Sequence, residues 1–148
     1  LVGEIVPYIR KHYNVYAESM AYGGYSLGGL AAIYSLYFDE TFSTIFSVCG
    51  SFWYPGFADY VVNNNVKNRN AAVYLLNGEQ EGVNHGNLLE QAPVKAHMVH
   101  EHLMSVMNAV SIFDEYGHHE NKSERINRLL SVLTGMEGSY ENGGKETK

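Results

Sequence analysis

The sequence is poor in cysteine, and this scarcity limits its covalent structure. Cys49 is the single cysteine in 148 residues, so no disulfide can form within the chain. It ends the apolar run Ile45–Cys49, where we expect a small, buried, hydrophobic side chain. Because reducing compartments do not favour disulfides, a lone cysteine fits a cytoplasmic protein, and we predict that location.

Long hydrophobic runs and positive charge are also lacking. No apolar run approaches the roughly 20 residues that a membrane-spanning helix needs. Lys and Arg number 10 against 16 Asp and Glu, which gives a formal net charge of −6, and the basic residues form no stripe. We therefore expect no nucleic-acid partner and no membrane partner. HExxH spacing and cysteine pairs are absent, and His97 and His100 lack a clear third ligand, so we expect no metal and no cofactor.

What the sequence does contain is enough apolar residues for one domain with a core. It is 45% hydrophobic and 18% charged, which is typical of a globular domain. We expect one domain over residues 1–137 and a polar, unstructured tail over residues 138–148. The first residue is Leu1, and the next residues already resemble the interior of a domain, so we expect the chain to be part of a longer protein.

Apolar periodicity predicts helices that alternate with short strands. The expected helices cover residues 1–13 (starting near residue 4), 27–38, 57–66, 88–107 and a closing segment around 126–133. The expected strands cover residues 16–22, 41–49, 71–76 and 109–113. Such alternation favours an α/β fold in which a parallel sheet has helices on its faces.

The chain is organised around Gly24-x-Ser26-x-Gly28, between the first expected strand and a helical apolar pattern. This spacing is typical of a nucleophile elbow, a sharp strand-to-helix turn that holds its central side chain exposed with φ > 0. Glycines two positions before and after leave room for the turn, and Gly28 and Gly29 would let the helix lie close to the strand. A common glycine-rich turn before an ordinary helix is the simpler alternative.

A serine hydroxyl needs a neighbouring base, and histidine is the usual one because its pKa is near neutral. An acid must then orient the imidazole. In folds with this elbow the order along the chain is Ser, acid, His. Glu79 and Glu81 follow the third strand and His118 and His119 follow the fourth. Because the carboxyl ends of parallel strands meet at one edge of the sheet, these side chains could converge on Ser26.

An aromatic loop follows the second strand, at the same predicted edge of the sheet. It contains Phe52 and Trp53, for which the sequence leaves two interpretations open. The two rings could form a wall that binds an acyl or aromatic part of a substrate. They could equally form a hydrophobic plug over the end of the sheet.

In these residues and their spacing, the sequence resembles the α/β-hydrolase esterase family, the esterase-D-like group. That group includes feruloyl and other carbohydrate esterases, S-formylglutathione hydrolase, siderophore esterases and mycolyltransferases. The resemblance covers about residues 5–133. It rests on Gly-Tyr-Ser26-Leu-Gly-Gly, on the segment from Ile5 to Tyr13, on the loop Ser51–Phe57, on Val73-Tyr74-Leu75 with Gly78-x-x-Glu81, and on Gly117-His118 with Arg125.

The resemblance implies a partial α/β-hydrolase fold, with the family's N-terminal strands and one of its oxyanion-binding loops missing from these residues. It favours Glu81 over Glu79 as the acid and His118 over His119 as the base, and it makes the backbone N–H of Leu27 an oxyanion donor. Two departures are Tyr116, where the family usually has glycine, and the second histidine after His118.

The activity that the resemblance implies is ester hydrolysis through an acyl-enzyme on Ser26. The substrate would be a small-molecule or carbohydrate ester, of the feruloyl or siderophore type. Three alternatives remain: a non-catalytic binding protein on the same fold, an inactive fragment, and an acyltransferase that passes the acyl group to an alcohol. The sequence does not specify the oligomeric state.

Overall fold

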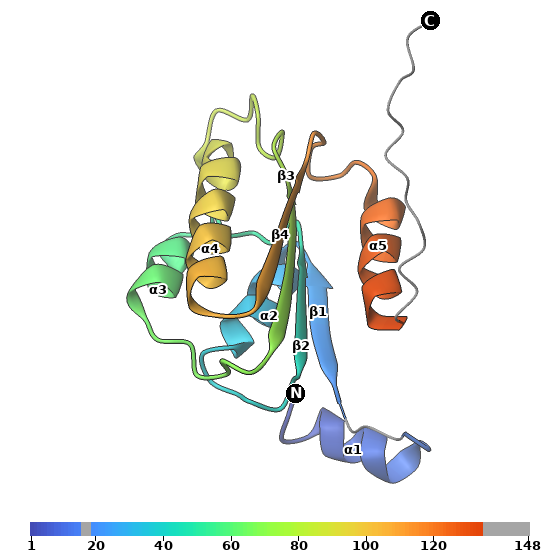
Figure 1. Ribbon diagram of the computed structural model, residues 1–148. Helices are drawn as coiled ribbons and strands as arrows, with labels where there is room; N and C mark the ends of the chain where they lie inside the picture. Colours follow the sequence, from blue (N-terminus) through green and yellow to red (C-terminus); the bar gives the residue numbers. More distant parts are fainter. Residues whose placement is uncertain (16–18, 135–148) are drawn as a thin grey trace, which may run out of the picture.

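The fold is a parallel sheet of four strands, described by a computed structural model over residues 1–15 and 19–134. The strands are β1 (Ala21–Tyr25), β2 (Thr44–Val48), β3 (Ala72–Gly78) and β4 (Ala109–Asp114), and they lie side by side in that order. Every neighbouring pair is parallel. All the strands therefore end at the same edge, which brings their following loops together (Figure 1).

Helices cover both faces of this sheet, as the sequence predicts. Helices α2 (Leu27–Ser35), α3 (Phe57–Asn63) and α4 (Ala92–Val106) lie on one face and α5 (Lys122–Thr134) lies on the other (Figure 1). Helix α1 (Ile5–His12) lies near the opposite end of the sheet from the loops that follow the strands (Figure 1). The α/β class and the parallel, two-sided sheet are confirmed. Among the described residues, no helix combines the length and apolarity needed to cross a bilayer.

The larger part of the core lies between the sheet and helices α2, α3 and α4. Its fully buried side chains include Ile33, Leu36, Ile45, Leu75, Val99 and Leu103. A smaller cluster beneath α5 contains Phe46, Val48, Cys49, Leu76 and Leu129. Cys49 is therefore a buried small hydrophobe, as predicted.

Helix α5 is covered less completely than its apolar pattern suggests. Of its four periodic apolar residues only Leu129 is buried, while Ile126, Leu130 and Leu133 are 42–49% exposed. All four line an apolar groove of about 340 Å³ that also contains residues of β1. The pattern therefore predicts the helix correctly and overstates its burial among the described residues.

The first strand differs most from its predicted position. It covers Ala21–Tyr25, not residues 16–22, and residues 16–18 lie outside the described part of the chain. The shift brings Gly23 and Gly24 into the strand, where Gly23 pairs with Phe46 of β2. An ideal Cβ on Gly23 would lie 2.8 Å from the Cβ of Phe46, so the glycine relieves a close contact within the sheet.

The predicted helix over residues 88–107 is divided in two. A short 3₁₀-helix, η1 (Leu88–Gln91), precedes α4, which begins at Ala92. Pro93 lies in the first turn of α4, where its missing N–H would have no intrahelical acceptor. The other elements match their expected ranges to within a few residues at each end. The predicted tail over residues 138–148 lies outside the described residues.

Candidate active site

Ser26 stands at a sharp bend between β1 and α2. Its backbone has φ 59° and ψ −119°, a left-handed conformation that is unusual for a residue with a side chain. The bend is fixed from both sides of the residue: the Ser26 N–H donates to the Val48 carbonyl, and the Ser26 carbonyl accepts from the N–H groups of Leu30 and Ser51. Its conformation is the one that the Gly24-x-Ser26-x-Gly28 spacing predicts.

The glycines around the bend do not all contribute in the same way. An ideal Cβ on Gly24 would lie 2.3 Å from the carbonyl carbon of Gly28, and one on Gly29 would lie 2.6 Å from Oγ of Ser47. A Cβ on Gly28 itself would meet no atom within 4 Å. The predicted steric need for glycine is therefore correct at positions 24 and 29 and wrong at position 28.

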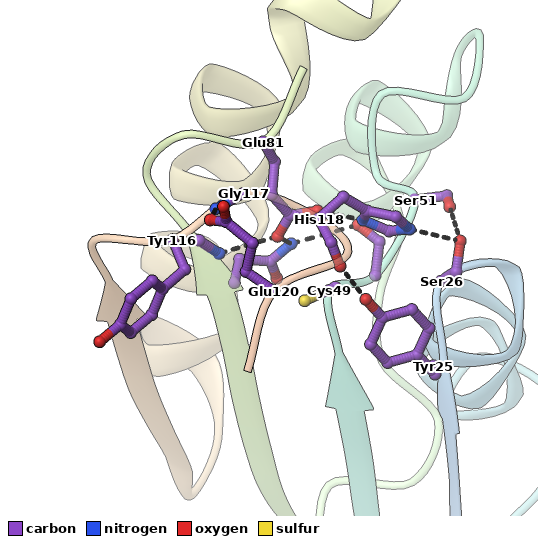
Figure 2. A network of polar contacts seen from close by, with 12 residues as sticks. Tyr25, Ser26, Cys49, Ser51, Glu81, Tyr116, Gly117, His118 and Glu120 are labelled. Atoms are coloured by element: carbon purple, nitrogen blue, oxygen red, sulfur yellow. Dashed lines mark hydrogen bonds and ion pairs between the residues drawn. The ribbon is translucent and has the colours of Figure 1, made fainter. Parts of the chain in front are cut away.

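The structure brings Ser26, His118 and Glu81 together in one hydrogen-bonded row (Figure 2). Oγ of Ser26 lies 3.1 Å from Nε2 of His118. Nδ1 of His118 lies 2.5 Å from Oε2 of Glu81. The three residues come from the loops after β1, β4 and β3, so the parallel sheet produces the predicted convergence.

The two alternative residues lie elsewhere. Glu79 contacts His97 of α4, with Oε1 3.0 Å from Nε2, and both side chains are exposed. His119 is exposed, and its ring lies edge-on to that of His118 with the centroids 4.9 Å apart. Among the candidates that the sequence leaves open, Glu81 and His118 are the two that lie in a hydrogen-bonded row with Ser26.

The carboxylate of Glu81 is buried and hydrogen-bonded on both oxygens. Only 3% of the residue is exposed. Its Oε1 accepts from the backbone N–H of Gly78 at 2.7 Å and from Nδ2 of Asn77 at 3.1 Å. Its Oε2 is left for His118. These donors stabilise a charged carboxylate that would otherwise be costly to bury.

The loop that carries His118 is held by a buried arginine. Arg125 makes a bidentate ion pair with Asp114, and its Nη1 donates to the Gly117 carbonyl at 3.0 Å and to Sγ of Cys49 at 2.9 Å. Burial lowers the pKa of the Arg125 guanidinium, but its hydrogen bonds to Asp114 and its electrostatic interactions with Cys49, Asp114 and Glu81 together outweigh this and raise it. The guanidinium therefore remains charged and fixes the end of β4 to the histidine loop.

Tyr25 holds the same loop from the side of β1. Its hydroxyl donates to the backbone carbonyl of His118 (Figure 2). The Tyr25 and His118 rings also lie in contact, with their centroids 5.2 Å apart. Burial raises the pKa of the Tyr25 phenol, so it stays a proton donor at neutral pH.

A cavity of about 330 Å³ opens beside Ser26 and His118. Its walls include Trp53, His85, Leu89, His119 and Glu120. Phe52 does not line this cavity: it is 1% exposed and lies stacked on Phe57 in the core, with ring centroids 5.7 Å apart. For Phe52, therefore, the substrate-wall interpretation is wrong and the hydrophobic-plug interpretation holds, whereas Trp53 does stand on the wall of the cavity.

The backbone N–H of Leu27 belongs to the first turn of α2, directly after Ser26. In that turn a backbone N–H has no intrahelical acceptor, and the helix dipole favours negative charge. Leu27 itself is 59% exposed. An anion that forms next to Oγ of Ser26 would be within the field of this helix terminus.

One group of metal-ligand types occurs within the described residues, and it coincides with the same site. A sulfur of Cys49, an oxygen of Glu81 and a nitrogen of His118 lie within 4.8 Å of one another. Burial raises the pKa of the Cys49 thiol to about 12, so the sulfur is protonated, and it accepts a hydrogen bond from the Arg125 cation. Because Glu81 and His118 already bind each other, this donor set does not suit a metal ion.

Sequence reasoning missed several residues that hold the site. Ser51 lies with its Oγ 3.1 Å from Oγ of Ser26, and Asn77 holds Glu81. Tyr25 appeared in the sequence only as a variable position of the glycine motif. Signals existed for Asn77 and Ser51, because both come soon after the expected strands over residues 71–76 and 41–49, at the predicted site edge. Their contacts with Glu81 and Ser26 appear only in the folded chain.

The chain matches the family model described as "Putative esterase" over residues 1–123, and it belongs to that family. The family confirms the resemblance found in the sequence. A curated relative, the uncharacterized protein YbbA of Bacillus subtilis strain 168, is 29% identical over 106 residues. That match covers 70% of this chain and 42% of the relative, so the chain spans less than half of the relative's length.

Solved structures with the same fold are also longer than this chain. The enterobactin esterase FES from Shigella flexneri aligns with a TM-score of 0.66 and 18% identity, over 90% of this chain and 35% of that one. A ferulic acid esterase aligns with a TM-score of 0.66 and 17% identity, over 90% of this chain and 58% of that one. At these identities the likeness defines the fold, which is that of part of an α/β-hydrolase.

Proposed function

We propose that residues 1–137 form the C-terminal portion of a serine esterase domain, with Ser26 as its nucleophile. The observation that carries this proposal is the row of contacts from Oγ of Ser26 to Nε2 of His118 and from Nδ1 of His118 to Glu81. Hydroxyl, imidazole and carboxylate in this order are the arrangement of a Ser-His-acid triad. Membership of the esterase family supports the same activity.

In the proposed acylation step, Oγ of Ser26 attacks the carbonyl carbon of the ester while Nε2 of His118 takes the hydroxyl proton. Glu81 holds Nδ1–H of His118 and stabilises the imidazolium that forms. The oxyanion of the tetrahedral intermediate accepts a hydrogen bond from the Leu27 N–H. The intermediate then collapses, the C–O bond to the alcohol breaks, and His118 returns the proton to the departing alkoxide oxygen.

Deacylation repeats these steps with water. The oxygen of a water molecule attacks the acyl carbonyl carbon while His118 takes a proton from that water. His118 then returns the proton to Oγ of Ser26 when the bond between Oγ and the acyl carbon breaks. The products are the carboxylic acid and the free serine. A second oxyanion donor, which the family resemblance assigns to an upstream loop, would add on the order of 10²–10³ in rate.

The proposed substrate is a small-molecule or carbohydrate ester of the feruloyl or siderophore type. The names of the structural neighbours, an enterobactin esterase and a ferulic acid esterase, support this class. Trp53 supports it as well, because an exposed part of an indole on the cavity wall offers a face for an aromatic acyl group. A cytoplasmic location and the absence of nucleic-acid, membrane and metal partners stay predictions.

The test is covalent labelling of the folded chain with a fluorophosphonate, followed by intact-mass measurement. We expect one adduct per chain, located on Ser26, and none in Ser26→Ala. Ser105→Ala, which removes an exposed hydroxyl on α4, is the matched control and should label like the wild type. Hydrolysis of p-nitrophenyl acetate should follow the same pattern. Absence of labelling under native conditions would instead favour a binding protein on this fold or an inactive fragment.

An acyltransferase would share the acyl-enzyme and differ in its acceptor. Product analysis with added sugars or alcohols separates the two activities. We expect free acid as the main product, and a new ester as the main product would contradict the hydrolase proposal.

A further inference from the structure

A second row of buried polar side chains extends from Glu81 on the side away from Ser26. Asn77, at the end of β3, is 1% exposed, and His100, in the middle of α4, is fully buried. Nδ2 of Asn77 lies 3.1 Å from Oε1 of Glu81, and Oδ1 of Asn77 lies 3.0 Å from Nε2 of His100. Nδ1 of His100 in turn lies 2.8 Å from Oγ of Ser111 in β4.

The direction of each hydrogen bond in this row follows from what the groups can donate. A carboxylate oxygen only accepts, so the amide group of Asn77 must face Glu81, and its other hydrogen points to the Gly50 carbonyl at 3.3 Å. The amide oxygen of Asn77 then faces His100, which must donate from Nε2. Nδ1 of His100 is left to accept from the hydroxyl of Ser111.

His100 is therefore a neutral imidazole with its proton on Nε2. Its surroundings agree with that state: the rings of Phe52 and Phe113 lie against it, with centroids 6.1 Å and 4.5 Å away. Burial, with a smaller contribution from nearby His97, lowers the pKa of His100 to about 3. The proton on Nε2 thus persists at every pH at which an esterase would normally work.

Resting on the serine-esterase function proposed above, we propose that Asn77 and His100 are positioning residues that orient the carboxylate of Glu81 toward His118. The Nε2–H of His100 fixes the amide of Asn77, and that amide fixes Oε1 of Glu81. The Asn77 amide and the Gly78 N–H together hold Oε1 of Glu81, and Oε2 then points at Nδ1 of His118. Neither residue contacts His118 or Ser26 in these hydrogen bonds, so both act through Glu81.

The alternative is that this row only satisfies buried polar groups and stabilises the core. The two roles differ in what they predict for His118. A positioning role alters the hydrogen bond between Glu81 and His118 when the row is broken. A purely structural role lowers the free energy of unfolding and leaves that hydrogen bond unchanged in the molecules that remain folded.

The experiment compares His100→Gln with His100→Phe in the chain as it stands. The amide nitrogen of glutamine can occupy the place of Nε2 and donate to Asn77, whereas phenylalanine fills the same space without a donor. The first readout is the ¹H NMR resonance of Nδ1–H of His118, assigned by its loss in His118→Gln. The second is the separation of kcat from KM for a p-nitrophenyl ester.

We expect the Nδ1–H resonance of His118 to shift or broaden in His100→Phe and in Asn77→Leu, and to stay near its wild-type position in His100→Gln. The kcat of the first two variants should fall about 10- to 100-fold with little change in KM, because small misplacement of a catalytic group can cost on the order of 100-fold. His100→Gln should recover most of that loss.

Two further variants keep the test decisive. Val99→Ala removes fully buried apolar atoms from the same helix, so it should lower the midpoint of unfolding and leave the resonance and kcat unchanged. Ser111→Ala provides the test if His100→Phe does not fold. It removes one hydroxyl from the far end of the row, so the resonance and kcat should change in the same direction as in His100→Phe, by a smaller amount.

A wild-type resonance and kcat in folded Asn77→Leu, His100→Phe or Ser111→Ala would overturn the positioning role, as would equal effects of glutamine and phenylalanine at position 100. If the wild-type chain neither hydrolyses esters nor takes the fluorophosphonate, the esterase proposal fails. The resonance still tests the orientation of Glu81 in that case, so the two failures are distinguishable.

Discussion

The backbone of Gly24 in β1 lies directly against the backbone of Gly28 in α2. A Cβ on Gly24 would approach the Gly28 carbonyl carbon to 2.3 Å, whereas a Cβ on Gly28 would have open space around it. We expect Gly24→Ala to lower the free energy of unfolding by about 2 kcal/mol or more, because strand and helix must separate. Gly28→Ala should be neutral or raise it by roughly 0.5–1 kcal/mol through better helix propensity.

Urea denaturation of the two glycine variants measures this difference. Equal losses at positions 24 and 28 would mean that the contact between strand and helix is not what requires glycine. The pair also tests the GxSxG pattern, because the pattern alone treats its two glycines alike.

The ion pair of Arg125 with Asp114 is the second testable feature. Arg125→Met leaves the Asp114 carboxylate without its ion-pair partner and removes the side-chain donor of the Gly117 carbonyl, so we expect a loss of about 3–5 kcal/mol in stability. Arg128→Met, on the exposed side of the same helix, should change stability by less than about 0.5 kcal/mol. Chemical denaturation of both variants provides the measurement. A loss below about 1 kcal/mol at position 125 would contradict a stabilising role for the buried ion pair.

His100 gives the stability a specific dependence on pH. Its pKa in the folded chain is about 3, against an ordinary 6.5, because burial disfavours the charged ring. Below pH 6.5 the unfolded chain binds a proton at this residue that the folded chain does not, so stability falls as the pH drops toward 3. The slope from this residue reaches at most about 1.4 kcal/mol per pH unit.

Unfolding measured in urea between pH 7 and pH 4 isolates this contribution by comparison with a variant. His100→Gln does not titrate, so its stability should fall less steeply with acid than that of the wild type. His102→Gln, on the same helix but partly exposed, leaves His100 in place and should keep the wild-type slope. Parallel curves for the wild type and His100→Gln would refute the assignment.

The two neighbouring aromatic residues Phe52 and Trp53 should behave in opposite ways. Phe52→Ala opens a cavity in the core and should cost about 3–5 kcal/mol of stability. Trp53→Ala should cost far less stability and raise KM for an aromatic ester by about two- to tenfold, since an aromatic contact contributes about 0.5–1.5 kcal/mol. The small ester p-nitrophenyl acetate is the reference substrate. If Trp53→Ala only removes a contact with the aromatic group, KM should rise for the aromatic ester and stay unchanged for p-nitrophenyl acetate. An unchanged KM for a feruloyl ester would remove Trp53 from the binding site.

Local signals in the sequence account for most of the fold. Alternating helical and strand patterns predict the order of elements, because each element must bury one apolar face against its neighbours. The same reasoning predicts that Ser26 meets a glutamate after the third strand and a histidine after the fourth, since parallel strands present their ends at one edge. The family resemblance then favours Glu81 and His118 among these candidates. The start of β1 was misplaced because Gly23 and Gly24 favour a turn locally, while in the folded sheet they relieve close contacts.

The supporting contacts could not be predicted in the same way. Asn77 and His100 lie 23 positions apart, and each has an ordinary local context of a strand end and a helix. Their relation depends on how α4 packs over β3, which a single sequence does not encode at the level of side chains. The apolar pattern also could not predict the exposure of Ile126 and Leu130. Periodicity identifies the apolar face of a helix but does not show which residues cover that face.

Ser26 and Cys49 occupy equivalent places at the ends of neighbouring strands. Tyr25 of β1 pairs with Val48 of β2, and Ser26 and Cys49 are the residues that follow them. Both have a left-handed φ, of 59° and 49° respectively. The sulfur of Cys49 lies within 4.8 Å of a nitrogen of His118 and an oxygen of Glu81, close to that hydrogen-bonded pair (Figure 2). Because residue 49 is fully buried there, the space beside the pair has little room for a larger side chain. A bulkier side chain there would have to displace its neighbours, and the imidazole and the carboxylate are among them, so the small size of a hidden thiol is part of what lets the catalytic row assemble.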